Sequence, residues 1–318
     1  RRAPGNMDIS TKRRERDKFQ ILSGYFNDKT TGTPLCAIIR NTDTSSKDYD
    51  LMKDIMRPSH GDYTGYIRYK GYNDYRGGGH FSGRITAPLV FAGAIAKIIL
   101  AKDDISIGSH IFSIGNIQDR SFDYLDMDEQ ILLELRDSPF PVLDHGIGIN
   151  MRELILNVKE HRDSIGGVIE TIVLNLPPGI GSPFFDSIES KISSLLFSIP
   201  GVKGVEFGKG FDIAKMNGSQ GNDEMYIYEG KVKTYSNNNG GILGGISTGM
   251  PLVFRTAFKP TPSIGIEQRT IDIKTKENTS LEVGGRHDPC IVPRAVPVVE
   301  SVAAIALLEL IMDVKKYG

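Results

Sequence analysis

Gly285-Arg286-His287-Asp288-Pro289-Cys290 stands shortly before the longest apolar segment of the chain, Val298 to Val314. Between Val302 and Leu308 that segment is apolar nearly all round, a pattern that predicts a helix enclosed by the core. The longest uninterrupted apolar run, Val302 to Leu308, is far short of the roughly 20 apolar residues that a membrane-spanning helix needs. We therefore expect no membrane segment and no signal peptide.

The hexapeptide concentrates a cation, an imidazole and a carboxylate in three consecutive positions. Pro289 prevents a helix from continuing and favours an extended backbone at Asp288. In an extended segment Arg286 and Asp288 share one face, and His287 points to the other. A cation and an acid on one face form either a site for an anionic substrate or a structural ion pair.

Composition excludes several classes of protein. Of the 318 residues 39% are hydrophobic and 24% are charged, which is ordinary for a soluble globular protein. The net charge of -1 argues against nucleic-acid or anionic-membrane binding. Cys36 and Cys290 make neither a disulfide framework nor a zinc site, so we expect no metal and a cytoplasmic location. The sequence shows no repeat or long linker, which favours a single domain over residues 1–318.

A second dense constellation is Arg57-Pro58-Ser59-His60-Gly61-Asp62. Pro58 and Gly61 exclude a regular helix and hold His60 on an ordered loop. The unperturbed pKa of histidine lies near neutrality, so His60 is a candidate proton donor or base. The alternative is a histidine that caps or hydrogen-bonds locally.

Glycine and arginine mark two further candidate anion sites. Arg76-Gly77-Gly78-Gly79-His80-Phe81-Ser82-Gly83-Arg84 leads into a predicted helix, Pro88 to Leu100, whose free N–H groups face the loop. The loop lacks the pattern of a P-loop. The N-terminal region with Arg2, Arg13 and Arg14 is either a solvated or nucleic-acid-binding arm or a phosphate clamp.

Hydrophobic periodicity gives the remaining elements. Strands are predicted at Phe19–Phe26, Leu35–Asn41, Ile105–Ile114, Val168–Leu176, Lys203–Phe211 and Leu252–Phe258. Helices are predicted at Asp128–Leu135, Asn150–His161 and Phe185–Phe197. The polar stretch Gly218 to Glu224 suggests a mobile loop.

Taken together, these segments closely resemble the chorismate synthase family. The matching blocks span the whole chain and include Arg57–Asp62, Gly77–Thr86, Asp163–Gly167, Ser198–Gly208, Asn239–Ser247, Lys259–Ile264, Gly285–Cys290 and Arg294–Pro297. The resemblance implies a lyase that converts 5-enolpyruvylshikimate 3-phosphate to chorismate and phosphate. That reaction is a 1,4-anti elimination without net redox change, yet it requires reduced FMN. The resemblance also implies an α+β fold, a β-α-β sandwich with helices between two antiparallel sheets, assembled as a homotetramer.

Residue roles follow from the same resemblance. His60 corresponds to a histidine that protonates reduced flavin, and Asp288 to an acid that relays the ring proton with a neighbouring imidazole. FMN contacts fall at His80, Phe81, Ser82, Ser194, Leu195, Gly244, Lys259, Pro260, Thr261, Pro262, Ser263 and Arg286. Cations suited to the leaving phosphate are Arg2, Arg13, Arg14 and Arg57.

Three departures from the family pattern affect these expectations. The family's N-terminal Gly-Glu-Ser-His-Gly block, which carries a second catalytic histidine, does not occur in this sequence. Either the sequence is incomplete or the chain is truncated, and for a truncated chain we expect little activity. His80-Phe81-Ser82 replaces the more common Arg-Ser-Ser. Asp8 stands where some members carry an arginine proposed to bind NADPH, so we expect reduced FMN to come from an external flavin reductase. The alternatives are a flavin-dependent oxidoreductase and a non-catalytic protein that binds flavin or an anion.

Overall fold

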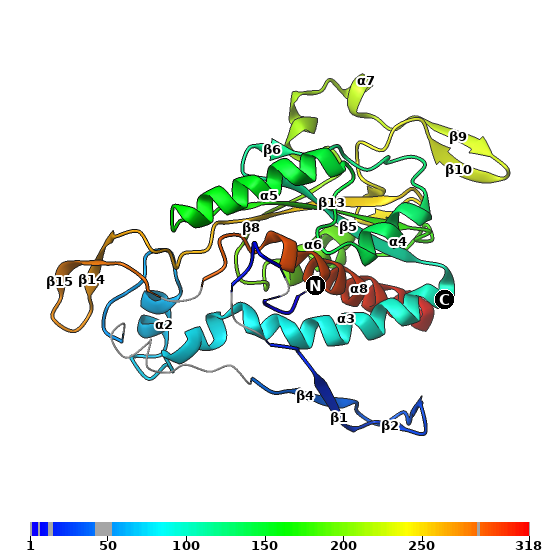
Figure 1. Cartoon of the computed structure of the whole chain (residues 1–318). Helices are drawn as coiled ribbons and strands as arrows, with labels where there is room; N and C mark the ends of the chain where they lie inside the picture. The colour runs from blue at the N-terminus through cyan, green and yellow to red at the C-terminus, as the bar shows by residue number, and fades with distance from the viewer. Residues whose placement is uncertain (1, 6, 12–14, 42–52, 285–286, 318) are drawn as a thin grey trace.

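The computed structural model describes residues 2–5, 7–11, 15–41, 53–284 and 287–317 (Figure 1). Three predicted site residues, Arg13, Arg14 and Arg286, lie outside the described residues. All other predicted site residues lie within them.

The core is built on a five-stranded antiparallel sheet in the order β6-β5-β7-β13-β8. Its strands are Ile117–Gln118, Ser106–Ile114, Gly167–Leu174, Leu252–Phe258 and Val202–Phe207. Alternate residues of the three central strands, such as Ile107, Val173 and Leu252, enter the main hydrophobic core. Because side chains alternate across a strand, their neighbours project from the opposite face.

Three helices cover the core face of this sheet: α3 (Thr86–Leu100), α6 (Ile188–Leu196) and α8 (Val292–Tyr317). On the far side of α3 lies a second antiparallel pair, β1 (Phe19–Ser23) with β4 (Cys36–Ile39) (Figure 1). Phe19 of β1 packs on Phe91 of α3 with ring centroids 4.9 Å apart. Helices therefore lie between antiparallel strands on both sides, which confirms the predicted α+β sandwich.

The central helix α8 begins six residues before the predicted Val298 and includes Pro297. A proline inside a helix removes one N–H donor, and a prediction from sequence therefore ends the helix there. Ser301 Oγ donates to the Pro297 carbonyl at 2.6 Å. By length and composition, residues 292–316 and 83–103 could each cross a membrane, but 72% of the first window is buried in the protein. Helix α8 is therefore a core helix, as its pattern predicts.

Helix α3 approaches α8 closely at Gly93. A Cβ atom there would lie 2.2 Å from Ser301 Cβ and 2.4 Å from Ser301 Cα on α8. We expect Gly93→Ala to force the two helices apart and to lower the free energy of unfolding by about 1–3 kcal/mol. Chemical denaturation measures this change. Gly218→Ala is the matched control, because a Cβ at Gly218 meets nothing within 4 Å, and a comparable loss in that variant would contradict the packing explanation.

The remaining elements lie around this sandwich. Two helices, α4 (Glu129–Asp137) and α5 (His145–Glu160), pack against β5, and α5 also reaches β6. Short helices are α2 (Asp62–Arg68), α7 (Gly218–Gly221) and the 3-10 turns η1 (Arg76–Phe81), η2 (Gly83–Ile85), η3 (Ala101–Asp103), η4 (Phe184–Asp186) and η5 (Gly210–Lys215). Small hairpins are β2–β3 (Tyr25–Phe26, Lys29–Thr30), β9–β10 (Met225–Tyr228, Lys231–Thr234), β11–β12 (Ile242–Leu243, Ile246–Ser247) and β14–β15 (Gln268–Asp272, Glu277–Leu281).

The stretch predicted as a mobile loop has a defined structure. Asp223 accepts hydrogen bonds from Ser236 Oγ at 2.6 Å and from the backbone N–H groups of Asn238 and Asn239 at 2.7 and 3.0 Å. Hydrogen bonds across a long loop leave no hydrophobic periodicity. Gly218–Gly221 also form the short helix α7, so the prediction of a loop was wrong for these residues.

A charged network lies on the sheet face opposite α3, α6 and α8. His110 Nε2 lies 3.1 Å from Glu170 Oε2, and Arg255 Nε donates to Glu170 Oε1 at 2.9 Å. His110 Nδ1 also lies 3.4 Å from Asp119. His110 and Glu170 are fully buried. Burial alone lowers the pKa of His110, but the two carboxylates outweigh it and raise that pKa above its usual value.

Candidate functional site

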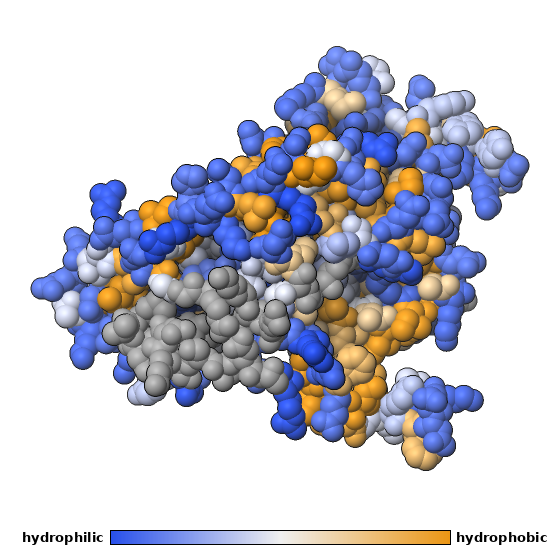
Figure 2. All heavy atoms as spheres, viewed as in Figure 1, coloured by the Kyte–Doolittle hydropathy of each residue, from blue (hydrophilic) through white to orange (hydrophobic). Residues whose placement is uncertain are grey.

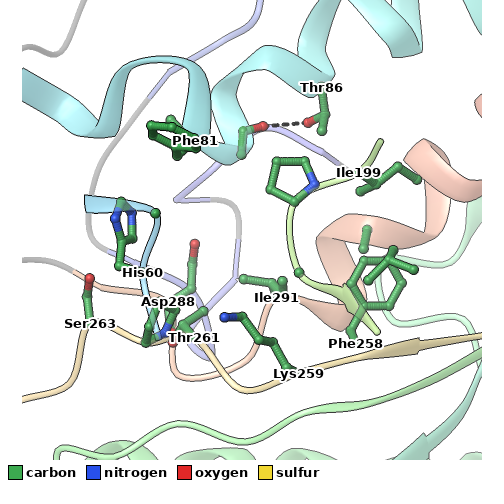
Figure 3. Close-up of a pocket in the computed structure, with 18 of the residues that line it drawn as sticks. His60, Phe81, Thr86, Ile199, Phe258, Lys259, Thr261, Ser263, Asp288 and Ile291 are labelled. Carbon is green, nitrogen blue, oxygen red and sulfur yellow. Dashed lines mark hydrogen bonds between the residues drawn. The ribbon is translucent and has the colours of Figure 1, made fainter. Parts of the chain in front are cut away.

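A concave pocket of about 600 Å³ opens where the N-terminal segment, the His60 loop, the turn before α3 and the start of α8 meet (Figure 3). Cations, hydroxyls and apolar side chains share its wall. Its cations are Arg2, Arg57, Arg84, Lys203, Lys259 and Arg294. Its hydroxyl groups include Thr11, Ser59, Ser82, Thr86, Thr261 and Ser263, and its apolar side chains include Phe81, Phe197, Ile199, Phe258 and Ile291. Pockets of this size and mixed character hold small ligands.

His60 sits on a tightly turned loop before α2. The preceding residue, Ser59, has a φ of 58°, which a residue other than glycine rarely adopts. Two hydrogen bonds hold this turn: His60 N donates to Arg57 O at 3.2 Å, and Lys259 Nζ donates to Ser59 O at 2.5 Å. Strained backbone of this kind clusters at binding and catalytic sites.

Asp62 holds both His60 and Arg57. Its Oδ1 lies 2.7 Å from His60 Nδ1, and the guanidinium of Arg57 donates to Oδ2 at 2.7 Å and to Oδ1 at 2.8 Å. Burial alone raises the pKa of Asp62, but the hydrogen bonds from His60 and Arg57 outweigh it and hold the pKa well below its usual range. The carboxyl group of Asp62 is therefore ionised near neutral pH.

Asp288 also lines the pocket, and both of its carboxylate oxygens are engaged. Oδ1 accepts from Thr11 N at 2.9 Å, and Oδ2 forms a short ion pair with Arg294 of α8. The backbone carbonyl of Asp288 accepts from Thr261 Oγ1 at 2.8 Å. The sequence predicted that His287 and Asp288 point to opposite faces of an extended segment. Both residues nevertheless line the pocket. Buried Cys290 nearby is an unreactive thiol, because burial raises its pKa to about 12.

Lys203 and Lys259 both line the pocket and bring two positive charges to it. Burial and, after it, the charge of Lys203 lower the pKa of Lys259. Among the described residues, neither ammonium group forms an ion pair with a carboxylate. Close cations without a counter-ion create a positive potential that favours an anionic ligand.

Phe81 is fixed by two glycines of the His60 region. A Cβ at Gly61 would lie 2.7 Å from the Phe81 ring, and one at Gly65 of α2 would lie 2.6 Å from it. The ring therefore lies directly on the loop and helix that carry His60 (Figure 3). His80 and Ser82 on either side also line the pocket.

The structure brings most of the predicted site residues together. Those that line the pocket are Arg2, Arg57, His60, His80, Phe81, Ser82, Lys259, Pro260, Thr261, Pro262, Ser263 and Asp288. Ser194, Leu195 and Gly244 lie outside its lining, on α6 and at the β11–β12 turn. The guanidinium of Arg2 is paired with Asp17, as that of Arg57 is with Asp62.

Four residues of the site were not singled out from the sequence: Thr11, Asp62, Lys203 and Arg294. Thr11 acts through its backbone N–H, which leaves no sequence signal. Asp62 stands two residues after His60, and this spacing could have suggested a carboxylate–imidazole pair. Lys203 and Arg294 occur inside blocks that carry the family resemblance, but no pattern in the sequence places them beside Lys259 and Asp288.

The chain matches known proteins over nearly its whole length. The family model described as chorismate synthase covers residues 1–312. The chain belongs to the chorismate synthase family. A chorismate synthase of Korarchaeum cryptofilum is 44% identical over 98% of this chain and 85% of its own length, and one of Thermococcus kodakarensis is 46% identical over 97% and 84%. A crystal structure of a chorismate synthase, 32% identical, covers 93% of this chain and 77% of its own with a TM-score of 0.71.

These matches confirm the predicted family, fold class and enzyme class. Chorismate synthases are carbon–oxygen lyases of the shikimate pathway. The conclusion rests on agreement between the family model, the relatives and a solved structure that covers 93% of this chain.

Proposed function

We propose that this chain catalyses loss of phosphate from 5-enolpyruvylshikimate 3-phosphate to give chorismate, with reduced FMN bound in the pocket described above. The observation that carries the proposal is the convergence of His60, Asp288 and Lys259 on one cavity from three distant parts of the sequence. Two acid–base groups, together with ammonium groups that form no ion pair with a carboxylate among the described residues, suit the release of a phosphate and the transfer of a proton.

The pocket offers groups suited to both parts of reduced FMN, the ribityl phosphate chain and the flat ring system. Lys259, Thr261 and Ser263 are suited to the phosphate and ribityl hydroxyl groups, because they offer an ammonium group and two hydroxyl groups. Phe81, Ile199 and Ile291 offer apolar surface to a flat ring system. The chemistry that reduced FMN supplies when bound is electron density for the substrate as phosphate leaves.

The cations of the wall bind and orient the anionic substrate. Lys203 joins the earlier candidates Arg2 and Arg57, whose guanidinium groups are partly neutralised by Asp17 and Asp62. Preorganised positive charge stabilises the negative charge that grows on the oxygens of a leaving phosphate.

Proton transfer is assigned to the chain's own acid–base groups. Among the described residues Oδ1 of Asp288 accepts from Thr11 N and Oδ2 pairs with Arg294, and a carboxylate oxygen has a second lone pair that can accept a proton. His287 is the imidazole beside it. We assign the second acid–base role to His60, which lines the same pocket.

We also propose a cytoplasmic homotetramer that receives reduced FMN from an external flavin reductase. Several large apolar side chains are exposed in one chain, among them Phe184 at 88% and Phe185 at 90%. Figure 2 shows apolar residues on the molecular surface around α3, where Ile98 is 64% exposed. Ser194, Leu195 and Gly244 lie outside the lining of this pocket, and we propose that they contact FMN bound to a second copy.

Lysine 259 offers a test of the flavin site that does not depend on turnover. We expect Lys259→Ala to weaken FMN binding about 10- to 100-fold, because a hydrogen bond to a charged group contributes roughly 1.5–3 kcal/mol. Quenching of flavin fluorescence measures the affinity. Lys274→Ala, on the exposed turn between β14 and β15, is the control. Equal affinity in both variants would contradict the assignment of the FMN phosphate to Lys259.

The reaction itself is tested by incubating the protein with 5-enolpyruvylshikimate 3-phosphate and chemically reduced FMN without oxygen. We expect chorismate and phosphate to form in equal amounts. If NAD(P)H is instead consumed in proportion to the product formed, the result would support a flavin-dependent oxidoreductase. Flavin binding without any product would support a protein that only holds the ligand.

A further inference from the structure

We propose that Asp62 is a positioning residue that fixes the tautomer of His60, so that His60 exchanges its proton with ligands at Nε2 alone. The inference rests on the proposed function for the role of that proton. The tautomer itself is a property of the protein without ligands.

The argument begins with a conflict at His60 Nδ1. This atom lies 2.7 Å from Asp62 Oδ1 and 3.1 Å from Arg57 Nη2. An ionised carboxylate can only accept a hydrogen bond, and a guanidinium can only donate. Nδ1 therefore cannot satisfy both neighbours, and its protonation state depends on which of them prevails.

The carboxylate prevails on distance and charge. Its contact with Nδ1 is the shorter one, and the opposing guanidinium of Arg57 already donates to the same carboxylate through Nε and Nη2. The other terminal nitrogen, Nη1, donates to Ser263 Oγ at 3.3 Å. Nδ1 is thus the donor, and the proton of the neutral ring stays on it.

The surrounding contacts make this arrangement rigid. Arg57 N also donates to Asp62 Oδ2 at 3.2 Å, so backbone and side chain of Arg57 clamp the same carboxylate. The side chains of Arg57, His60 and Asp62 are only 7%, 13% and 20% exposed. Little water can therefore compete for Asp62, and a charge-assisted hydrogen bond in such surroundings is strong.

The consequence for proton transfer concerns the second ring nitrogen. With Nδ1 donating to Asp62, only Nε2 of His60 is left for a ligand in the pocket, and no described residue forms a hydrogen bond with it. When the protonated ring gives up a proton at Nε2, it returns to the tautomer that Asp62 stabilises. A carboxylate that orients a catalytic imidazole plays the same part in serine proteases.

Removing the negative charge should reverse the tautomer. In Asp62→Asn the ion pair with Arg57 is lost, and the guanidinium 3.1 Å away becomes the natural donor to His60 Nδ1. The neutral ring then carries its proton on Nε2. Nitrogen-15 NMR of histidine-labelled protein, recorded at alkaline pH where the ring is neutral, distinguishes the two tautomers.

We expect His60 to be protonated at Nδ1 in the unsubstituted protein and at Nε2 in Asp62→Asn. Asp74→Asn is the matched control, because Asp74 forms a similar ion pair with Arg76 on the exposed surface, outside the pocket lining. A His60 ring protonated at Nε2 in the unsubstituted protein overturns the proposal, even if Asp62→Asn does not fold. An unchanged tautomer in folded Asp62→Asn overturns it as well.

Kinetics separate this inference from the proposed function. We expect kcat in Asp62→Asn to fall about 100-fold or more, because a misdirected proton removes general acid–base catalysis. The affinity for FMN should stay within about twofold, which a general loss of structure would not allow. If the tautomer is as expected but no chorismate forms even in the unsubstituted protein, the proposed function fails and the positioning of His60 by Asp62 stands.

Discussion

Replacing Asp288 by asparagine should reduce kcat for chorismate formation by about 10²- to 10⁴-fold, the contribution expected of a positioned acid–base group. Asparagine keeps the size of the side chain and can still accept from Thr11 N. It cannot take up a proton, and it loses the ion pair with Arg294. The proton-transfer function is therefore removed with little change in shape.

Binding of FMN distinguishes this effect from collapse of the pocket. We expect the dissociation constant for FMN to change less than about threefold in Asp288→Asn, and the far-ultraviolet circular dichroism spectrum to be unchanged. Steady-state assays under anaerobic conditions give kcat. Turnover at the normal rate in Asp288→Asn would show that the proton leaves by another route and that the Asp288 assignment is wrong.

Replacing Glu170 by alanine should lower the free energy of unfolding by about 3–5 kcal/mol, the usual cost of removing one partner from a buried ion pair. Glu170 is fully buried between His110 and Arg255, and it also accepts from Tyr124 at 2.6 Å and from the backbone N–H of Phe122 at 2.7 Å. Alanine removes this carboxylate from these donors and from His110 and Arg255. Urea denaturation near neutral pH measures the loss.

The pH dependence of the same variant has a definite sign. Burial raises the pKa of Glu170, but hydrogen bonds from His110 and Tyr124 outweigh it and depress the pKa below its usual value. A depressed pKa contributes stability that is fully present above the unfolded value, about 4.3, and is lost as the pH falls through the folded value. The difference between the unsubstituted protein and Glu170→Ala should therefore shrink in strong acid.

Glu206→Ala is the matched control, because Glu206 pairs with the same Arg255 at 3.3 Å but is 27% exposed. Its removal should cost about 1 kcal/mol or less. Similar losses in both variants would show that burial of Glu170 is not what makes the network stabilising.

Much of the fold could be predicted because its main elements have a clear period. Strand β13 was predicted with the observed bounds, Leu252 to Phe258, and β5 and β7 were placed within two residues. These strands are central in the sheet, so burial on both faces dominates their composition. The start of α8 was missed because Pro297 is tolerated in a helix that its packing holds in place.

The hairpins could not be predicted in the same way. Strands β9–β10 and β14–β15 are mostly exposed or half-buried, so neither hairpin shows a core-facing alternation. Backbone hydrogen bonds rather than buried side chains hold them together. Such pairing is not visible in hydrophobic periodicity.

The residues of the candidate site also differ in how far the sequence could predict them. His60, Lys259 and Asp288 could be named because proline, glycine and charge gather around them and because their blocks resemble those of a known family. Partners contributed by distant segments, such as Arg294 for Asp288 and Lys203 for Lys259, depend on how the chain closes on itself. The sequence also gave no sign that Arg2 and Arg57 would be ion-paired within the chain.

The most direct measurement is the number of chorismate molecules formed for each molecule of reduced FMN, in an oxygen-free assay with 5-enolpyruvylshikimate 3-phosphate in large excess. A redox-neutral elimination in this pocket predicts many products for each flavin, with equal phosphate released and the flavin still reduced at the end. Product limited to one molecule per flavin, with the flavin oxidised in step, would contradict it.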